Sequence, residues 1–421
     1  MSFEKPIMVA ETLRKWNARG ELGSCRRLSR RAPASPLESA ATLLSVIAGF
    51  ATAEGTARYR KRFQQLAEAD FFRHPPNVPC AGELWLSSIG LGTYLGEPDD
   101  ATDAEYMAAI TLAMRSGINA LDSAINYRHQ RSERNIGSAL AALTANDEVK
   151  RDEIFVSTKA GYLSFDGNLP SDPRSYFVRE YIESRIVNPK DVVGGMHCLA
   201  PDYLRDQIER SRKNLGLETI DLFYLHNPET QLAEITLEAF RERLKQAFAF
   251  LETCVKHARI RQYGLATWNA FRVPEGSRDA IALQTVVEIA REAAGAAHHF
   301  RFIQLPFNLA MPEAFVLANQ NVEKKNISVL DAAGQLRIGV VGSATLYQGR
   351  LSHGLPAFVT QALGMNNDSE NAIQFARSTP GITTSLIGMG HPEHVAANLK
   401  PALLPPAKRD DWMKLFTRRE S

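Results

Sequence analysis

The chain has 421 residues, of which 44% are hydrophobic and 23% charged, with a formal net charge of +2. This length and composition predict one large folded core with additional segments. The nearly balanced charge gives no indication of a nucleic-acid partner, and we find no apolar run of the 18 or so residues that a membrane span requires. The four cysteines, Cys25, Cys80, Cys198 and Cys254, lack CxxC or zinc-site spacing. We therefore expect reduced thiols, no metal site and a cytoplasmic location.

Residues 1–83 differ from the rest of the chain. Up to Arg62 they contain twelve Lys or Arg and five Glu, with basic clusters at 26–31 and 58–62. The apolar run between these clusters, Leu43–Ala51, begins too far from residue 1 for an export signal. We expect a basic N-terminal extension that is partly helical or disordered, then a domain over 84–400 and a tail over 401–421.

From residue 84 onward, short apolar runs alternate with helical patterns. Helices are expected over 101–117 and 201–216, where Gly117 and Gly216 provide stop signals. Eight such runs between helices favour a closed parallel (β/α)8 barrel over a doubly wound sheet, although periodicity alone leaves the open sheet possible. The predicted strands cover 86–92, 118–124, 154–160, 220–226, 261–267, 302–308, 338–344 and 383–389.

One connection is much longer than the 2–6 residues usual for a βα loop. It is an insertion over 163–200 that follows the third predicted strand and contains Phe165, Tyr176, Phe177 and Tyr181. Such aromatic content predicts an ordered segment. Because the insertion leaves the strand that carries Lys159, we expect a lid over a pocket; a structural cap or an oligomer contact are the alternatives.

Four side chains at or just past predicted strand ends have matched chemistry: Asp122, Tyr127, Lys159 and His226. A tyrosine can protonate a carbonyl oxygen while a hydride reaches the carbon, and an ammonium nearby is expected to lower its pKa from about 10. Asp122 would hold the ammonium of Lys159, and His226 would orient the substrate oxygen. Taken alone, Tyr127 or His226 is better explained as a half-buried side chain satisfied by the backbone, and only the four residues together favour catalysis.

The order and spacing of these four residues resemble the aldo-keto reductase superfamily. The resemblance runs from about Leu84 to Lys400 and includes SSIGLGTYLG, RSERNIGSAL, IERSRKNLGLETIDLFYLHNP, QLPFNL and IGMGHPEHVAANL. It implies a TIM barrel that reduces an aldehyde or ketone with NADPH or NADH, with Tyr127 as the general acid. It also explains why no glycine-rich dinucleotide fingerprint is present, since these barrels hold the cofactor extended over the strand ends.

The resemblance also implies the cofactor contacts. Gln304 corresponds to the glutamine that binds the nicotinamide carboxamide, Thr267 (or nearby Asn269) replaces an asparagine, and Gly342 replaces a stacking aromatic, a role open to Trp268 or Tyr347. Gly388 and His394 replace the Lys and Arg that bind the adenosine 2′-phosphate, which weakens the expected NADPH preference. The full expected set is Thr93, Thr267, Gln304, Ser343, Leu346, His394 and Asn398, with Tyr94, Asn126 and Trp268 as substrate contacts and Arg128 as a further polar candidate.

Two other functions remain open from the sequence. The same four residues could run proton chemistry without net redox change, as in a dehydratase or an epimerase. Alternatively, the barrel could be a cofactor-sensing or scaffolding module whose basic extension recruits a partner. The expected ligand of the leading hypothesis is a small-molecule carbonyl compound, and the oligomeric state is left undetermined.

Overall fold

The computed structural model describes residues 46–417, so the basic cluster at 26–31 and Cys25 lie outside the described residues. Eight parallel strands form a closed barrel in the order β11-β12-β3-β4-β5-β6-β7-β8. The predicted (β/α)8 fold and its eight strands are confirmed. The barrel strands are β3 (Ile89–Gly92), β4 (Ala120–Asp122), β5 (Phe155–Ala160), β6 (Ile220–His226), β7 (Ile260–Ala266), β8 (Phe300–Pro306), β11 (Gly339–Ser343) and β12 (Ile382–Gly388).

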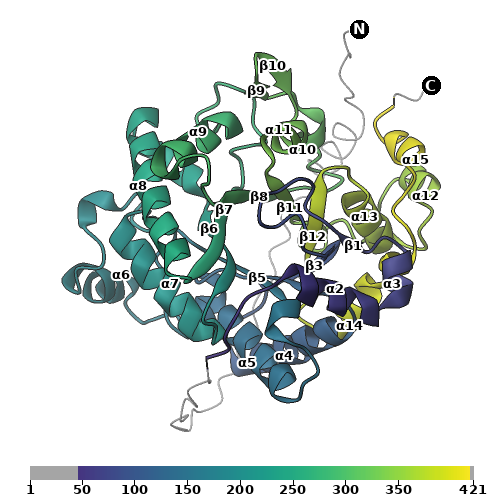
Figure 1. The fold of residues 1–421 in the computed structure, drawn as a ribbon, viewed down its shortest axis with the longest axis horizontal. Coiled ribbons are helices and arrows are strands. Elements are labelled where there is room, and N and C mark those ends of the chain that lie inside the picture. The colour runs from purple at the N-terminus through teal and green to yellow at the C-terminus, as the bar shows by residue number, and fades with distance from the viewer. Residues whose placement is uncertain (1–45, 418–421) are drawn as a thin grey trace.

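Helices surround the barrel (Figure 1). The predicted stop signals follow the helix ends: α4 ends at Arg115, before Gly117 at φ +101°, and α7 ends at Leu215, before Gly216 at φ +63°. Glycine tolerates this left-handed conformation because it has no Cβ. The main helices are α4 (Asp100–Arg115), α5 (Arg131–Ala145), α7 (Pro201–Leu215), α8 (Leu237–Lys256), α9 (Leu283–Ala294), α11 (Val329–Leu336), α13 (Asp368–Arg377) and α14 (Pro392–Asn398).

Shorter elements connect and extend this frame. Two small antiparallel sheets pair β1 with β2 and β9 with β10. The shorter elements are α2 (Ala53–Arg62), α3 (Gln64–Glu68), β1 (Phe72–Arg73), β2 (Leu86–Ser87), α6 (Pro173–Phe177), α10 (Glu313–Val316), β9 (Gln320–Val322), β10 (Lys325–Ile327), α12 (Ala357–Leu363) and α15 (Arg409–Met413), with the helical turns η1 (Tyr127–Gln130), η3 (Val178–Glu183), η4 (Pro189–Asp191) and η5 (Pro228–Ala233).

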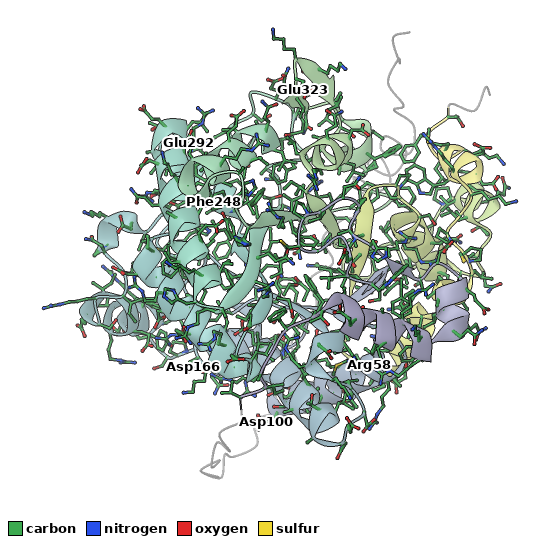
Figure 2. All side chains as sticks on the ribbon, in the orientation of Figure 1. Arg58, Asp100, Asp166, Phe248, Glu292 and Glu323 are labelled. Carbon is green, nitrogen blue, oxygen red and sulfur yellow. The ribbon has the colours of Figure 1, made fainter. Side chains whose placement is uncertain are left out.

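Strand alternation divides the core into two apolar clusters. Leu222 and Tyr224 of β6 belong to the cluster that includes Phe155 and Phe302, whereas Phe223 belongs to the large cluster shared with the helices. Successive strand residues face opposite sides of a sheet, so the first cluster fills the barrel and the second joins it to the helix layer. Figure 2 shows the apolar Phe248 of α8 inside the molecule and the charged Glu292 of α9 at its periphery.

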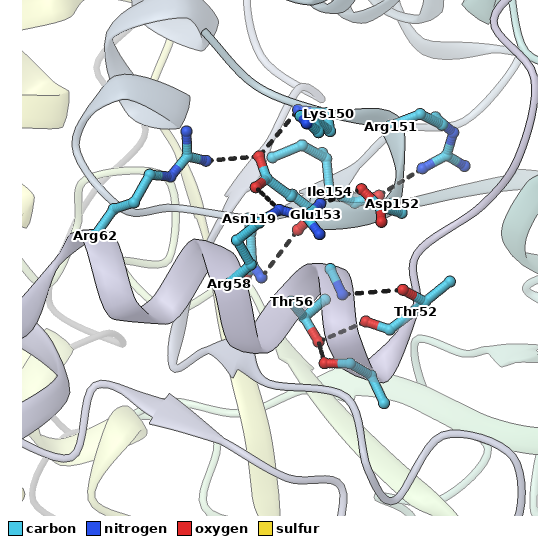
Figure 3. Close-up of polar contacts among 12 residues, drawn as sticks. Thr52, Thr56, Arg58, Arg62, Asn119, Lys150, Arg151, Asp152, Glu153 and Ile154 are labelled. Carbon is cyan, nitrogen blue, oxygen red and sulfur yellow. Dashed lines mark hydrogen bonds and ion pairs between the residues drawn. The ribbon is translucent and has the colours of Figure 1, made fainter. Parts of the chain in front are cut away.

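The described part of the N-terminal extension is attached to the barrel. Arg58 of α2 pairs with Asp152 at 2.5 Å and Glu153 at 2.9 Å, and Arg62 pairs with Glu153 at 2.6 Å (Figure 3). Gly55 is required at this contact because a Cβ there would lie 2.1 Å from the Asp152 carbonyl oxygen. The expected helical content is present in this stretch, while the domain division at residue 83 stays a prediction.

The middle of the insertion, which contains α6 and η3, lies beside α7. Figure 1 shows α6 beside α7 at the edge of the molecule. Phe165 stacks on Phe177 with ring centroids 4.6 Å apart, Tyr181 is buried, and Glu180 pairs with Arg210 of α7 at 2.6 Å. The aromatic residues therefore bury one another against the outside of the barrel. Within residues 46–417, no helix is long and apolar enough to cross a membrane, and no cluster of His, Cys, Asp and Glu could hold a metal ion.

Candidate active site

A cavity of about 1240 Å³ opens at the carboxyl ends of the barrel strands. Its floor is formed by the last residues of several strands, among them Gly92 of β3, Asp122 of β4, His226 of β6 and Ala266 of β7. Enzymes with this fold place their active sites at this end of the barrel. No residue of 163–200 lines the cavity. The expected position of the insertion over the pocket mouth is therefore wrong.

Asp122 in the cavity floor forms a buried ion pair with Lys159, which lies beneath the floor. The Lys159 Nζ is 2.5 Å from Asp122 Oδ2 and 2.6 Å from the Ser123 carbonyl oxygen. Asp122 Oδ1 accepts hydrogen bonds from Ser157 Oγ at 2.8 Å and from Gln304 Nε2 at 2.9 Å. Lys159 is fully buried and does not line the cavity. Burial lowers the pKa of Lys159, and the Asp122 charge opposes that shift.

Tyr127 begins a turn that the chain maintains in an unusual backbone conformation. Arg128, His129 and Gln130 have φ values of +47°, +54° and +73°. Residues with a side chain disfavour this region, so neighbouring contacts must stabilise the turn. The buried Arg128 supplies several of them, donating to Asp103 Oδ1 at 2.5 Å and to Asn135 Oδ1 at 2.8 Å. Arg128 does not line the cavity, so it is a support for the turn and was wrong as a polar substrate contact.

Tyr127 lies over Lys159, whose Nζ is 4.8 Å from the centroid of the tyrosine ring. We expected the ammonium to lower the pKa of Tyr127. Burial instead raises the pKa of Tyr127 well above its ordinary value, and the Asp122 charge adds to the increase. The physical reason is first the burial of the phenol, which has lost the water that would stabilise its charged form, and second the negative charge of Asp122, which opposes the effect expected from the ammonium. Tyr127 is therefore protonated throughout the neutral range.

His226 ends β6 beside Tyr127, with ring centroids 5.7 Å apart. Burial lowers the pKa of His226 well below its ordinary value, and the charge of Lys159 adds to the decrease. The imidazole is therefore neutral. Its buried Nδ1 has no hydrogen-bond partner within the part of the chain that the structure describes. The carbonyl oxygen of His226 accepts a hydrogen bond from the ring of His197 at 2.8 Å.

The residues expected to hold a dinucleotide share this cavity. Thr267 and Thr345 also carry buried hydroxyl groups without a partner among residues 46–417, which suits a polar ligand extended across the floor. Asn269, the alternative to Thr267, bonds Asp279 and does not line the cavity. The expected cofactor residues that line it are Thr93, Thr267, Gln304, Ser343, Leu346, His394 and Asn398, and Trp268 and Tyr347 line it as well.

The lining of the cavity also includes Gly388 and several ionisable side chains. A Cβ on Gly388 would lie 3.2 Å from Leu95, so an apolar side chain occupies the space beside it. His391 Nδ1 is 3.3 Å from Glu105 Oε2. The exposed side chains of Arg350 and Lys400 also line the cavity. Among residues 46–417, they are the only Lys and Arg side chains that line the cavity.

The expected substrate residues Tyr94, Asn126 and Trp268 also line the cavity. Tyr94 and Trp268 are 58% and 44% exposed, which places them at its mouth. Sequence reasoning missed Tyr162 and Asn227, whose side chains are 3.2 Å apart and line the same space. Both residues lie just past the ends of β5 and β6, and this position in the sequence could have identified them as site residues.

Comparison with known proteins agrees with this geometry. The Aldo/keto reductase family model matches residues 88–353. The chain belongs to this family. It is 24% identical over 186 residues to rabbit (Oryctolagus cuniculus) prostaglandin-E(2) 9-reductase, a match that covers 44% of this chain and 42% of that protein. It is 26% identical over 188 residues to aldose reductase B of Dictyostelium discoideum, a match that covers 43% of this chain and 47% of that protein. These alignments span less than half of each relative's length.

Solved structures of the family share the fold over a larger part of the chain. An aldo-keto reductase from Bacillus halodurans in its holo form has a TM-score of 0.54 and 17% identity, covering 83% of this chain and 98% of that one. A Klebsiella pneumoniae aldo/keto reductase in complex with NADP and acetate has a TM-score of 0.52 and 18% identity, covering 80% and 94%. At this identity the likeness shows the fold alone.

Proposed function

We propose that this protein is an NAD(P)H-dependent reductase of a small aldehyde or ketone, with Tyr127 as the general acid. The observation that carries the proposal is the convergence of Tyr127, the Asp122–Lys159 pair and His226 at one end of the barrel. Three of these side chains line the cavity, and Lys159 lies directly beneath Tyr127. Family membership supports the same chemistry.

A dihydronicotinamide, when bound, supplies a hydride to the carbonyl carbon. The carbonyl π electrons move to the oxygen, and the Tyr127 phenol transfers its proton there to complete the alcohol. The raised pKa of Tyr127 keeps the proton on the phenol until an alkoxide, a much stronger base, develops beside it. The ammonium of Lys159 then stabilises the phenolate that remains. Neutral His226 can orient the substrate oxygen with a ring nitrogen.

The cofactor residues each have a distinct part. Gln304, whose Nε2 is oriented by Asp122, would contact the carboxamide, and the hydroxyl of Thr267, which has no partner among residues 46–417, would contact the same group. The stretch from Ser343 to Leu346 would cover the pyrophosphate, and Asn398 would contact the adenine. With Gly388 and the Glu105–His391 pair at the far end, we propose that NADH is accepted at least as readily as NADPH.

The test combines binding with turnover in the full chain. Titration of NADH and NADPH, followed by nicotinamide fluorescence, should show binding, and a panel of aldehydes and ketones should then consume the reduced form. Tyr127→Phe keeps the ring and removes the proton, so turnover should fall by about 10²–10⁴-fold with unchanged dinucleotide affinity.

A matched control is Tyr59→Phe, which removes a buried hydroxyl that bonds the Met114 carbonyl far from the cavity. It should lower stability and leave turnover intact. Retention of more than about a tenth of wild-type turnover in Tyr127→Phe would remove Tyr127 from the mechanism. Dinucleotide binding without consumption by any carbonyl compound would favour the proton-chemistry or sensing alternatives.

A further inference from the structure

A second buried histidine lies behind His226 and belongs to the insertion. His197 is fully buried, and its Nε2 is 2.8 Å from the His226 carbonyl oxygen. On the opposite side of the ring, Gln231 Nε2 is 2.8 Å from His197 Nδ1 and 3.2 Å from the His197 carbonyl oxygen. A series of hydrogen bonds thus runs from Gln231 of η5 through His197 to the His226 carbonyl at the end of β6.

Arg243 determines the direction of every hydrogen bond in this series. Its Nη1 is 2.5 Å from Gln231 Oε1, and the same guanidinium contacts the carbonyl oxygens of Lys190 and Asp191 in the insertion. A guanidinium only donates, so the oxygen of Gln231 must face Arg243 and its NH2 group must face His197. His197 Nδ1 can then only accept, and the proton must be on Nε2, where it is donated to the His226 carbonyl oxygen.

We propose that His197 is a positioning residue: the Arg243–Gln231–His197 series fixes the backbone of His226 and thereby aims its imidazole at the substrate oxygen. This role rests on the proposed reductase function. His197 belongs to the insertion at 163–200. The insertion therefore contributes to the site through the backbone of His226, without lining the cavity.

Two observations indicate that the backbone sets the position of His226. Its Nδ1 has no hydrogen-bond partner within the described residues, so that nitrogen does not anchor the ring. Asn227, the next residue, has the left-handed φ of +45°, so the chain turns sharply at the point that His197 contacts. Gly161 makes the approach possible, because a Cβ there would lie 2.5 Å from the His226 oxygen and 2.8 Å from His197 Nε2.

The test compares three variants of the full chain. His197→Phe keeps a ring and removes the donor, and His197→Gln restores an N–H at the reach of Nε2. His298→Phe is the matched control, since His298 is also a buried histidine, bonded to Arg301, and does not line the cavity. The readouts are kcat, KM, the dinucleotide Kd by fluorescence, and nitrogen-15 NMR of the histidine rings.

For His197→Phe we expect kcat to fall by about 10- to 100-fold, the scale of a misplacement near 1 Å, with the dinucleotide Kd unchanged. His197→Gln should recover to within about threefold of wild type, and His298→Phe should keep wild-type kcat even if it is less stable. In the wild-type protein, NMR should show His197 as the Nε2–H tautomer, and the His226 ring signals should shift in His197→Phe.

Several results would overturn the proposal. One is an Nδ1–H or doubly protonated His197 at pH 7; another is His226 signals that do not change in His197→Phe. Equal losses of kcat in His197→Phe and His298→Phe would show only a stability effect. If the wild-type protein reduces no carbonyl compound, the proposed function fails, while the tautomer and the His226 signals still decide whether His197 positions His226.

Discussion

The buried pair of Asp122 and Lys159 gives a sharp prediction for Asp122→Asn. The replacement keeps the shape of the side chain and removes its charge. Asp122 accepts three hydrogen bonds, from Lys159, Ser157 and Gln304. An asparagine has one oxygen, so its NH2 group must face Lys159 or the other two donors. The lowest-cost arrangement keeps the oxygen on Lys159 and rotates the amide of Gln304, the group proposed to contact the carboxamide.

The expected loss of stability follows from the removal of one partner of a buried ion pair. Removing one partner costs about 3–5 kcal/mol in stability because the other charge is left uncompensated. Lys159 can escape that cost by losing its proton, since burial already lowers its pKa from 10.5 and Asp122 opposes that shift more strongly than the charge of Glu133 does. A lowered pKa in the folded state means that the unfolded chain binds more protons in the pH range between that lowered pKa and 10.5. The stability deficit should therefore be full near pH 7 and narrow as the pH rises toward 10.

Asp221→Asn is the matched control. Asp221 is also buried and pairs with Arg151 at 2.7 Å, at the opposite end of the barrel. Arg151 cannot lose its proton in the accessible range. Urea denaturation at pH 7 and pH 9.5 should give similar deficits for the two variants at pH 7, and only that of Asp122→Asn should shrink at pH 9.5. Only Asp122→Asn should lower turnover and weaken dinucleotide binding.

The coupling of Lys159 to Asp122 would be refuted by two results together. One is a deficit in Asp122→Asn that stays constant from pH 7 to pH 9.5, as in Asp221→Asn. The other is wild-type turnover in Asp122→Asn across the same range. Both would mean that the ammonium of Lys159 does not depend on Asp122.

Three other predictions are independent of one another. Lys159→Met should abolish turnover near neutrality, and its effect should not add to that of Asp122→Asn, because both changes act on one network; additive kcat losses in the double variant would count against this. Glu105→Gln removes an exposed negative charge beside His391, so the ratio of NADPH to NADH affinity should rise about two- to fivefold; an unchanged ratio of fluorescence-derived Kd values would show that Glu105 does not select the cofactor. Burial lowers the pKa of His197 from 6.5 to about 4, so the unfolded chain takes up the proton at a higher pH than the folded protein. Protonation of His197 should therefore lower the free energy of unfolding by about 2 kcal/mol between pH 7.5 and pH 5. Urea denaturation of His197→Phe should show a loss of stability over this range that is smaller by the same amount.

Much of the barrel could be predicted from sequence, for a physical reason. Each buried parallel strand is a short apolar run, and glycines such as Gly117 and Gly216 mark where helices end. Because all eight strands run the same way, residues at their carboxyl ends must meet. The resemblance to aldo-keto reductases, rather than strand geometry, assigned side chains as distant in sequence as Tyr94 and Asn398 to one site, and both line the cavity.

The pKa of Tyr127, the direction of the Arg128 side chain and the position of the insertion depend on tertiary contacts that a sequence does not reveal. The predicted direction of the pKa shift of Tyr127 was wrong because burial of the phenol raises its pKa and the Asp122 charge adds to that increase, and these effects outweigh the ammonium. Arg128 looked like a polar side chain beside the site, but the left-handed turn points it into a buried network. Aromatic content predicted that the insertion would be ordered without indicating which surface it would cover.

The two ends of the insertion contact the backbone next to Tyr127 and at His226. Near its start, the Gly167 N–H donates to the His129 carbonyl at 2.8 Å and the Phe165 carbonyl accepts from Gln130 at 3.0 Å, so it contacts two of the three left-handed residues after Tyr127. Near its end, His197 bonds the carbonyl of His226. Left-handed residues cost roughly 1–2 kcal/mol each and persist only where surrounding contacts over-determine them. One outer segment thus supports the backbone on both sides of the proposed site, which explains how it can matter to the chemistry without lining the cavity.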